Sequence, residues 1–197
     1  KSMAMIKSVR TDALNRQIYI ILPNISVSMA GKAVAFIRHA KSSWSDATLS
    51  DLERPLNDRG LRDAPRVAQH LAGLIAAQHM EMVCSPALRA RQTCELFARQ
   101  FEFPPGQERV DEALYFDGVE AYTACLHDCS PQTEICLVFG HNPTIEALAG
   151  IFRPPFIGHI PTCCVLLCKL ESVQWKGATP SLLTIEQVII PKQLDRG

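Results

Sequence analysis

Two arginines and two histidines stand at or shortly after the ends of predicted strands. They are Arg38, His39, Arg89 and His141. A guanidinium group binds carboxylate and phosphate oxygens through a fork of hydrogen-bond donors. An imidazole can transfer protons or bind a metal ion near neutral pH. A pocket that contains both side-chain types would bind an anionic substrate and act on it. Such a pocket forms only if the intervening elements bring the four residues together.

Short apolar runs predict the strands of a sheet, and segments of helical periodicity separate most of them. The predicted strands are 33–37, 82–84, a short piece near Val110, 134–139, 163–170 and 182–190. The predicted helices are 57–78, capped by Asn57, then 87–100, 118–129 and about 142–152. This alternation predicts an α/β fold, a three-layer α/β/α sandwich with a mainly parallel central sheet. No helix separates the last two strands, so we expect at least one antiparallel strand near the C-terminus.

The carboxyl ends of parallel strands meet at one edge of a sheet, and ligands bind there in open α/β folds. Arg38 and His39 follow the first strand, Arg89 lies one turn into the helix after the second, and His141 follows the strand 134–139. The fold would therefore gather the four residues at one edge.

Composition bounds the classes to which the chain can belong. It has 197 residues, of which 47% are hydrophobic and 20% charged, and its formal net charge is zero. This excludes a disordered chain and favours one compact domain, which we place at residues 31–197. A balanced charge also argues against a broad nucleic-acid-binding face.

No apolar run reaches the roughly 18 residues that span a bilayer, so we expect no membrane association. Residues 1–30 are interpreted as an N-terminal extension. Basic residues before the apolar stretch 18–22 resemble a weak export signal, although Asp12 and Pro23 interrupt the pattern. Met29 is an alternative start. The eight cysteines lie mostly in apolar runs and form no Cys-x-x-Cys pair, which favours a reducing, cytoplasmic compartment and argues against a zinc site.

The chain resembles the histidine phosphatase superfamily, and within it the small SixA-type phosphohistidine phosphatases. The similarity covers about residues 32–194. The matching stretches, in order, are Arg38-His-Ala-Lys-Ser42, Asp51-Leu-Glu-Arg-Pro-Leu-Asn-Asp-Arg-Gly60, Cys84-Ser-Pro-Ala-Leu-Arg-Ala-Arg-Gln-Thr93 and Phe139-Gly-His-Asn-Pro143. Pro161-Thr162 and the ending Ile190-Pro-Lys-Gln-Leu194 also match.

The resemblance implies that His39 is a nucleophile that forms a phosphohistidine intermediate. For this role the ring must be neutral, and its second nitrogen should donate to a backbone carbonyl that fixes the tautomer. Arg38 and Arg89 would hold the phosphoryl oxygens, and a protonated His141 would supply a further donor. These donors would replace a metal ion, so neither a metal nor a cofactor is expected.

Further residues are assigned with weaker support. Asn142, Ser45 and Thr162 are predicted to help bind phosphate, although ordinary turn or strand polarity explains the two hydroxyls equally well. Larger family members carry a general acid in the middle segment, and no acid stands at the matching place in 111–117. Glu112 is the first candidate substitute, Asp111 is a second, and Asp117 has weaker support. The basic run Arg54, Arg59, Arg62 and Arg66 is interpreted as a solvated helix face in preference to a docking patch.

A missing acid favours a phosphohistidine substrate, because imidazole leaves more easily than an alkoxide. The leading hypothesis is a metal-independent phosphatase that acts on phosphohistidine in a phosphotransfer or signalling protein. Two alternatives stay open. One is a general phosphomonoesterase of the same superfamily, and the other is a phosphate-binding module without turnover.

Overall fold

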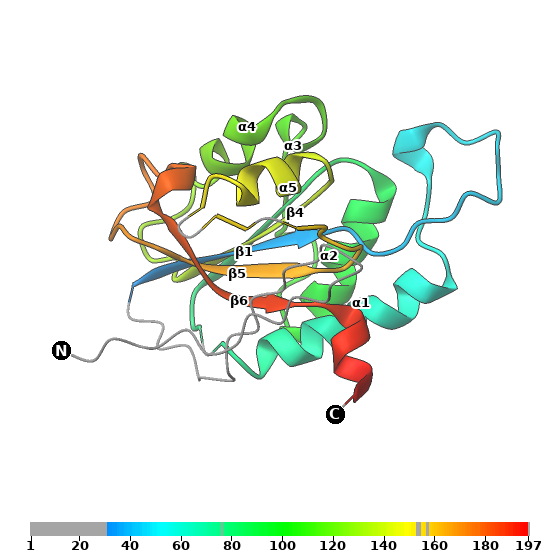
Figure 1. Ribbon diagram of the computed structural model, residues 1–197, viewed down its shortest axis with the longest axis horizontal. Coiled ribbons are helices and arrows are strands. Elements are labelled where there is room, and N and C mark those ends of the chain that lie inside the picture. Colours follow the sequence, from blue (N-terminus) through cyan, green and yellow to red (C-terminus); the bar gives the residue numbers. More distant parts are fainter. Residues whose placement is uncertain (1–30, 76, 153–154, 157, 197) are drawn as a thin grey trace, which may run out of the picture.

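A six-stranded sheet forms the centre of the computed structural model, which describes residues 31–75, 77–152, 155–156 and 158–196. The predicted extension 1–30 lies outside the described residues. The strands are β1 (Lys32–Arg38), β2 (Met80–Cys84), β3 (Arg109–Val110), β4 (Ile135–Gly140), β5 (Val165–Leu170) and β6 (Leu183–Ile189). Their order across the sheet is β3-β2-β4-β1-β5-β6 (Figure 1).

The sheet is mainly parallel, as predicted. β1 pairs in parallel with β4, β4 with β2, and β2 with β3. β5 runs antiparallel to both β1 and β6. The chain can reverse between the last two strands because only a loop with one 3-10 turn, η2 (Pro180–Leu182), joins them. The predicted antiparallel strand near the C-terminus is confirmed.

Helices cover both faces of the sheet, which gives three layers (Figure 1). They are α1 (Asp58–Ala72), α2 (Leu88–Gln100), α3 (Ala113–Phe116), α4 (Val119–Ala124) and α5 (Thr144–Ala149), with 3-10 turns η1 (Asp51–Glu53) and η3 (Pro191–Arg196). Successive side chains of a strand point to opposite faces. Phe36 therefore packs in one core with Tyr122 of α4, while its neighbour Ile37 packs in the other with Val67 of α1 and Phe97 of α2.

Three predicted helices differ from the observed ones, and one of them, about 142–152, is observed as the shorter α5, Thr144–Ala149. Asn57 caps α1 as expected, since its side chain accepts a hydrogen bond from the Gly60 N–H at 3.0 Å. The helix nevertheless ends at Ala72, because Gly73 forms its C-cap, and the apolar residues that follow bury themselves from a turn. The predicted helix 118–129 is shorter, and a separate helix, α3, precedes it. Extended backbone at Asp117 and Gly118 separates the two.

Two further sequence-based expectations concern membrane association and the state of the cysteines. None of the helices in the described part of the chain is long and apolar enough to span a bilayer. All eight cysteines, each of them within the described residues, are buried and unpaired.

Gly140, the last residue of β4, lies against the ring of Tyr122. A Cβ atom at position 140 would be 2.0 Å from the Tyr122 hydroxyl oxygen. That hydroxyl donates to the Leu114 carbonyl at 3.1 Å and accepts the His141 N–H at 2.8 Å. The absence of a side chain at Gly140 therefore allows a buried tyrosine to hold the backbone directly after β4.

We expect Gly140→Ala to lower the free energy of unfolding by about 2–3 kcal/mol, because the buried ring cannot move aside without breaking its packing. Chemical denaturation would measure this change. Gly73→Ala is the matched control, since a Cβ there meets its nearest atom at 3.4 Å and the backbone is helical. Equal stability of the two variants would contradict this account of Gly140.

Candidate active site

The four residues predicted to converge do so at the carboxyl ends of β1, β2 and β4. The rings of His39 and His141 have their centroids 5.0 Å apart. Arg89, in the first turn of α2, places its Nε 3.3 Å from His39 Nε2. The backbone N–H of His39 donates to the Gly140 carbonyl at 2.9 Å, which connects the end of β1 to the end of β4. Arg38 lies directly before His39 and completes the group.

One tautomer of the neutral His39 ring follows from its contacts. Nδ1 lies 2.7 Å from the carbonyl oxygen of Ala40. A carbonyl can only accept, so Nδ1 carries the proton and Nε2 holds the lone pair. The Arg89 Nε–H donates to this Nε2. The backbone carbonyl that the sequence could not identify is therefore that of Ala40.

The surroundings of His39 keep its ring neutral. The residue is buried, and loss of solvation lowers its pKa to about 3. The hydrogen bond to Ala40 opposes this change, while His141 and the positive charges of Arg89 and Arg38 reinforce it. A neutral ring with a lone pair on Nε2 is the form required for attack on an electrophile.

His141 is held from two sides. Its Nε2 lies 2.7 Å from the Ser85 hydroxyl, and its backbone N–H donates to Tyr122. Burial, followed by the charge of Arg89, lowers the pKa of His141 to about 4, although Asp51 opposes the change. The ring is therefore neutral at pH 7 in these surroundings, whereas the sequence predicted a protonated ring. A bound phosphoryl group would act in the opposite direction, because its negative charge favours the imidazolium.

Asp51, in η1, lies against the far side of Arg89. Its Oδ2 accepts from Arg89 Nη2 at 2.7 Å and from the Tyr115 hydroxyl at 2.7 Å, and its Oδ1 accepts from Arg54 Nη1 at 2.5 Å. Partial burial acts to raise the pKa of Asp51, but these bonds and the two guanidinium charges outweigh it and lower the pKa. The carboxylate is therefore ionised at neutral pH.

Three buried polar atoms at the site have no partner among the described residues, namely Arg38 Nε, His141 Nδ1 and Asn142 Oδ1. Buried polar atoms are nearly always hydrogen-bonded, so such atoms call for a specific explanation. Arg38 Nη1 donates to the Ile160 carbonyl at 2.6 Å, which fixes the guanidinium beside His39. Arg38 Nε is thus a donor that a substrate oxygen could use.

The weaker predictions have mixed outcomes. Thr162 is half-buried and lines a cavity together with Arg38. The amide nitrogen of Asn142 donates to Glu146 Oε1 at 2.7 Å and to the Ile160 carbonyl at 3.0 Å, so it supports the fold around Arg38. Ser45 lies in an exposed turn, bonded to the Ser43 hydroxyl at 2.8 Å.

Glu112 is exposed at the start of α3. Within the described residues it has no side-chain hydrogen bond or ion pair with Arg38, His39, Arg89 or His141. The site therefore includes a carboxylate, but it belongs to Asp51 and not to the predicted residue.

Four residues at the site were missed at the level of sequence. They are Asp51, Ser85, Thr93 and Tyr115. Thr93 connects the backbone that follows β1 to α2. Its hydroxyl accepts the backbone N–H of Ala40 at 3.0 Å and donates to the Arg89 carbonyl at 2.6 Å. Ser85 directly follows β2, so the strand-end rule that found His39 would also have selected it. Nothing in the spacing of Asp51 and Tyr115 indicates their contact, since 64 residues separate them.

Within the described ranges, no group of three or more His, Cys, Asp or Glu side chains is arranged to hold a metal ion.

We expect the free energy of unfolding to fall as the pH is lowered from 7 to 5. Unfolded histidines take up a proton near pH 6.5, whereas the pKa of His39 is about 3 and that of His141 about 4 in the fold. The unfolded chain then binds more protons, and each group lowers stability by up to about 1.4 kcal/mol per pH unit. Chemical denaturation across this range would measure the free energy of unfolding at each pH. Its dependence on pH should be shallower in His39→Asn and in His141→Asn than in the wild type. The exposed His79 provides the control variant, and equal slopes throughout would contradict the neutral rings.

The chain is similar to several known proteins. A model of the histidine phosphatase superfamily, branch 1, matches residues 34–115. An uncharacterised chloroplastic protein of Arabidopsis thaliana is 28% identical over 164 residues, covering 79% of this chain and 73% of that protein. An uncharacterised protein of Mycobacterium tuberculosis is 34% identical over 113 residues, covering 57% of this chain and 67% of that protein.

Solved structures show the same fold. The putative phosphohistidine phosphatase SixA of Nakamurella multipartitia is 26% identical with a TM-score of 0.67, and the match covers 81% of this chain and 96% of that one. A protein histidine phosphatase SixA complexed with tungstate is 23% identical with a TM-score of 0.67, and the match covers 82% of this chain and 99% of that one.

Proposed function

Because the chain belongs to the histidine phosphatase superfamily, we propose that it hydrolyses phosphohistidine on a protein through a phosphohistidine intermediate at His39. The observation that carries this proposal is the fixed tautomer of His39, whose Nδ1 faces the Ala40 carbonyl at 2.7 Å and leaves the Nε2 lone pair beside Arg89. A neutral nucleophile next to guanidinium groups suits attack on a phosphoryl group.

The reaction has two steps in this proposal. Nε2 of His39 attacks phosphorus, the bond between phosphorus and the substrate imidazole breaks, and the leaving imidazole takes up a proton from solvent. Water then attacks the phosphoryl group on His39, the new P–N bond breaks, and inorganic phosphate leaves. His39 returns to its neutral form, and no net oxidation or reduction occurs.

Charge on the phosphoryl oxygens would be stabilised by Arg38, Arg89 and His141. The unpaired Arg38 Nε supplies a donor position that the protein itself does not use. The unpaired His141 Nδ1 supplies a second one when Nε2 accepts from the Ser85 hydroxyl or when the ring is protonated. Preorganised donors of this kind stabilise a transition state without reorganising during the reaction. The Ser85 hydroxyl positions the His141 ring at 2.7 Å.

The ionised Asp51 favours phosphohistidine over alkyl phosphates as the substrate. A carboxylate with a lowered pKa holds no proton to give to a leaving group at neutral pH. An alkoxide needs that proton, whereas an imidazole leaves without a positioned acid. In this mechanism Asp51 orients Arg89 and does not act as a general acid.

Asp51→Asn should therefore retain turnover of phosphohistidine. It should also lower the inhibition constant of inorganic phosphate by about two- to fivefold, because a negative charge that competes for the buried Arg89 is removed. The change is modest because the Asp51 carboxylate is about half exposed and solvent screens its charge. Steady-state kinetics with added phosphate would measure both. Asp46→Asn, in the same exposed loop, is the control. Loss of turnover in Asp51→Asn, with the affinity for phosphate retained, would contradict a role confined to orienting Arg89.

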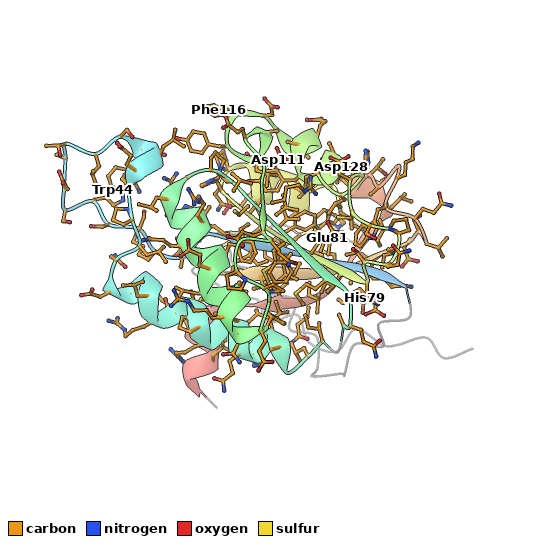
Figure 2. All side chains as sticks on the ribbon, turned by 180° about the vertical axis from the view of Figure 1, so that it is seen from behind. Trp44, His79, Glu81, Asp111, Phe116 and Asp128 are labelled. Carbon is orange, nitrogen blue, oxygen red and sulfur yellow. The ribbon has the colours of Figure 1, made fainter. Side chains whose placement is uncertain are left out.

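A protein substrate accords with the surface beside the site. Trp44 and Phe116 are 73% and 64% exposed, and Figure 2 shows them on the loop after β1 and on α3. Exposed aromatic side chains are typical of protein-binding surfaces. We place the substrate among phosphotransfer proteins of a signalling pathway. The eight buried, unpaired thiols support a reducing, cytoplasmic compartment.

A panel of phosphorylated substrates tests the proposal. It should contain a histidine-phosphorylated protein, phosphoramidate, an aryl phosphate and an alkyl phosphate, and released inorganic phosphate should be measured at pH 7. We expect hydrolysis of the two P–N compounds to exceed that of the alkyl ester clearly. Efficient turnover of the alkyl ester would indicate a general phosphomonoesterase, and tight binding without release from any member would indicate a phosphate-binding module.

A further inference from the structure

A cavity of about 360 Å³ lies beside the site and shares only Arg38 with the four catalytic candidates. His39, Arg89 and His141 do not line it. Its charged lining comes from five basic residues, Arg38, Lys41, Arg59, His159 and Lys192. Because Arg38 precedes His39 directly, a group bound in this cavity would lie next to the phosphoryl site.

The basic residues of this cavity are not fully neutralised. Arg59 Nε pairs with Asp63 at 3.2 Å, and His159 Nδ1 lies 2.9 Å from Glu146. The side chains of Lys41 and Lys192 are exposed and have no ion pair with another residue whose side chain is described. The described lining therefore carries a local excess of positive charge in a chain whose overall charge is zero.

The backbone brings Lys41 and Arg59 together by close packing. The Asn57 N–H donates to the Lys41 carbonyl at 2.9 Å. A Cβ at Gly60 would lie 2.3 Å from that same carbonyl oxygen, so only glycine lets the start of α1 approach this closely. The stretch 57–60 therefore places one wall of the cavity. Lys192, in η3 after β6, also lines the cavity.

We propose that this basic cavity binds an acidic segment of the phosphohistidine-bearing protein while the phosphoryl group occupies the site at His39. This inference rests on the proposed function and specifies the substrate as an acidic one. Lysine ammonium groups act as flexible point charges and suit carboxylates of varied geometry. Complementary charge at such a place raises the rate of encounter and fixes the register of the partner. A nucleic acid is disfavoured, because the whole chain has no basic excess.

Binding of unphosphorylated peptides tests the cavity without using catalysis. A fluorescent peptide with a histidine flanked by Asp and Glu should bind the full chain more tightly than its Asn and Gln counterpart, and the difference should shrink as salt is added. The double variant Lys41→Ala/Lys192→Ala should bind the acidic peptide about three- to tenfold more weakly. Lys176→Ala is the matched control, since its exposed lysine lies in the loop after β5, at the opposite end of the sheet.

Equal affinity for the two peptides, or an equal loss of affinity in the double variant and in Lys176→Ala, would overturn the inference.

Kinetics add a second readout. With phosphorylated versions of both peptides, the double variant should raise KM for the acidic one and leave the KM ratio between neutral peptide and phosphoramidate unchanged. If neither peptide is dephosphorylated, the proposed function fails, while preferential binding of the acidic peptide would still support the cavity. Preference for a small bisphosphate over the acidic peptide would overturn the assignment to a protein segment.

Discussion

His39→Ala should lower the rate of phosphohistidine hydrolysis by about 10⁴-fold or more, which is the order of magnitude found when a covalent nucleophile is removed. The variant loses Nε2, the atom that receives the phosphoryl group. It retains Arg38, Arg89 and His141, so affinity for inorganic phosphate should change far less than turnover. Release of phosphate and isothermal titration with phosphate would measure the two quantities separately.

The control for this prediction is His79→Ala. His79 is exposed and precedes β2, so it lies at the opposite end of the sheet from the site (Figure 2). Its removal should leave turnover unchanged. Thermal unfolding of both variants would exclude loss of the fold as the cause. Substantial turnover in folded His39→Ala would show that another group, or water itself, attacks phosphorus.

Arg89→Ala should have the second-largest effect, a loss of about 10²–10³ in kcat, as when one donor to a transition-state oxyanion is removed. Its guanidinium touches His39 Nε2 at 3.3 Å and Asp51 Oδ2 at 2.7 Å. Removing it leaves the charge of Asp51 beside the site with one guanidinium partner fewer. Repulsion between that carboxylate and the phosphoryl oxygens then adds to the loss of a donor.

Arg89→Lys separates charge from geometry. A lysine restores one positive charge but cannot contact two acceptors through a planar fork, so we expect recovery of only part of the activity. Arg91→Ala is the control, because Arg91 is exposed on the same helix two residues later. Full activity of Arg89→Lys would show that only the charge at this position matters. Wild-type activity of Arg89→Ala would remove Arg89 from the mechanism.

The sheet and the place of the site could be predicted from the sequence, because both follow from short-range patterns. The run that became β1 is continuously apolar since both faces of the strand are covered by helices. His39 and His141 could then be placed at one edge by a rule about strand ends. The strand pairing that joins them, His39 to the Gly140 carbonyl at 2.9 Å, follows from the parallel register of β1 and β4.

The remaining parts of the site depend on contacts between loops, which periodicity does not encode. Asp51 reaches Arg89 from a 3-10 turn, and Tyr115 reaches Asp51 from a helix of four residues. Neither element has a repeat long enough to reveal which side it turns toward the site. The neutral state of His141 could not be predicted from the sequence either. Burial is the largest cause of its lowered pKa, and only the fold defines that burial.

Trapping the covalent intermediate tests the central claim most directly. The protein should be mixed with a histidine-phosphorylated substrate that carries labelled phosphate, quenched in alkali within milliseconds and digested for mass spectrometry. We predict label on the Nε2 atom of His39 in the wild-type enzyme. The His39→Ala enzyme should carry no label. Release of labelled phosphate at full rate with no label on His39, or label on another residue, would contradict the account.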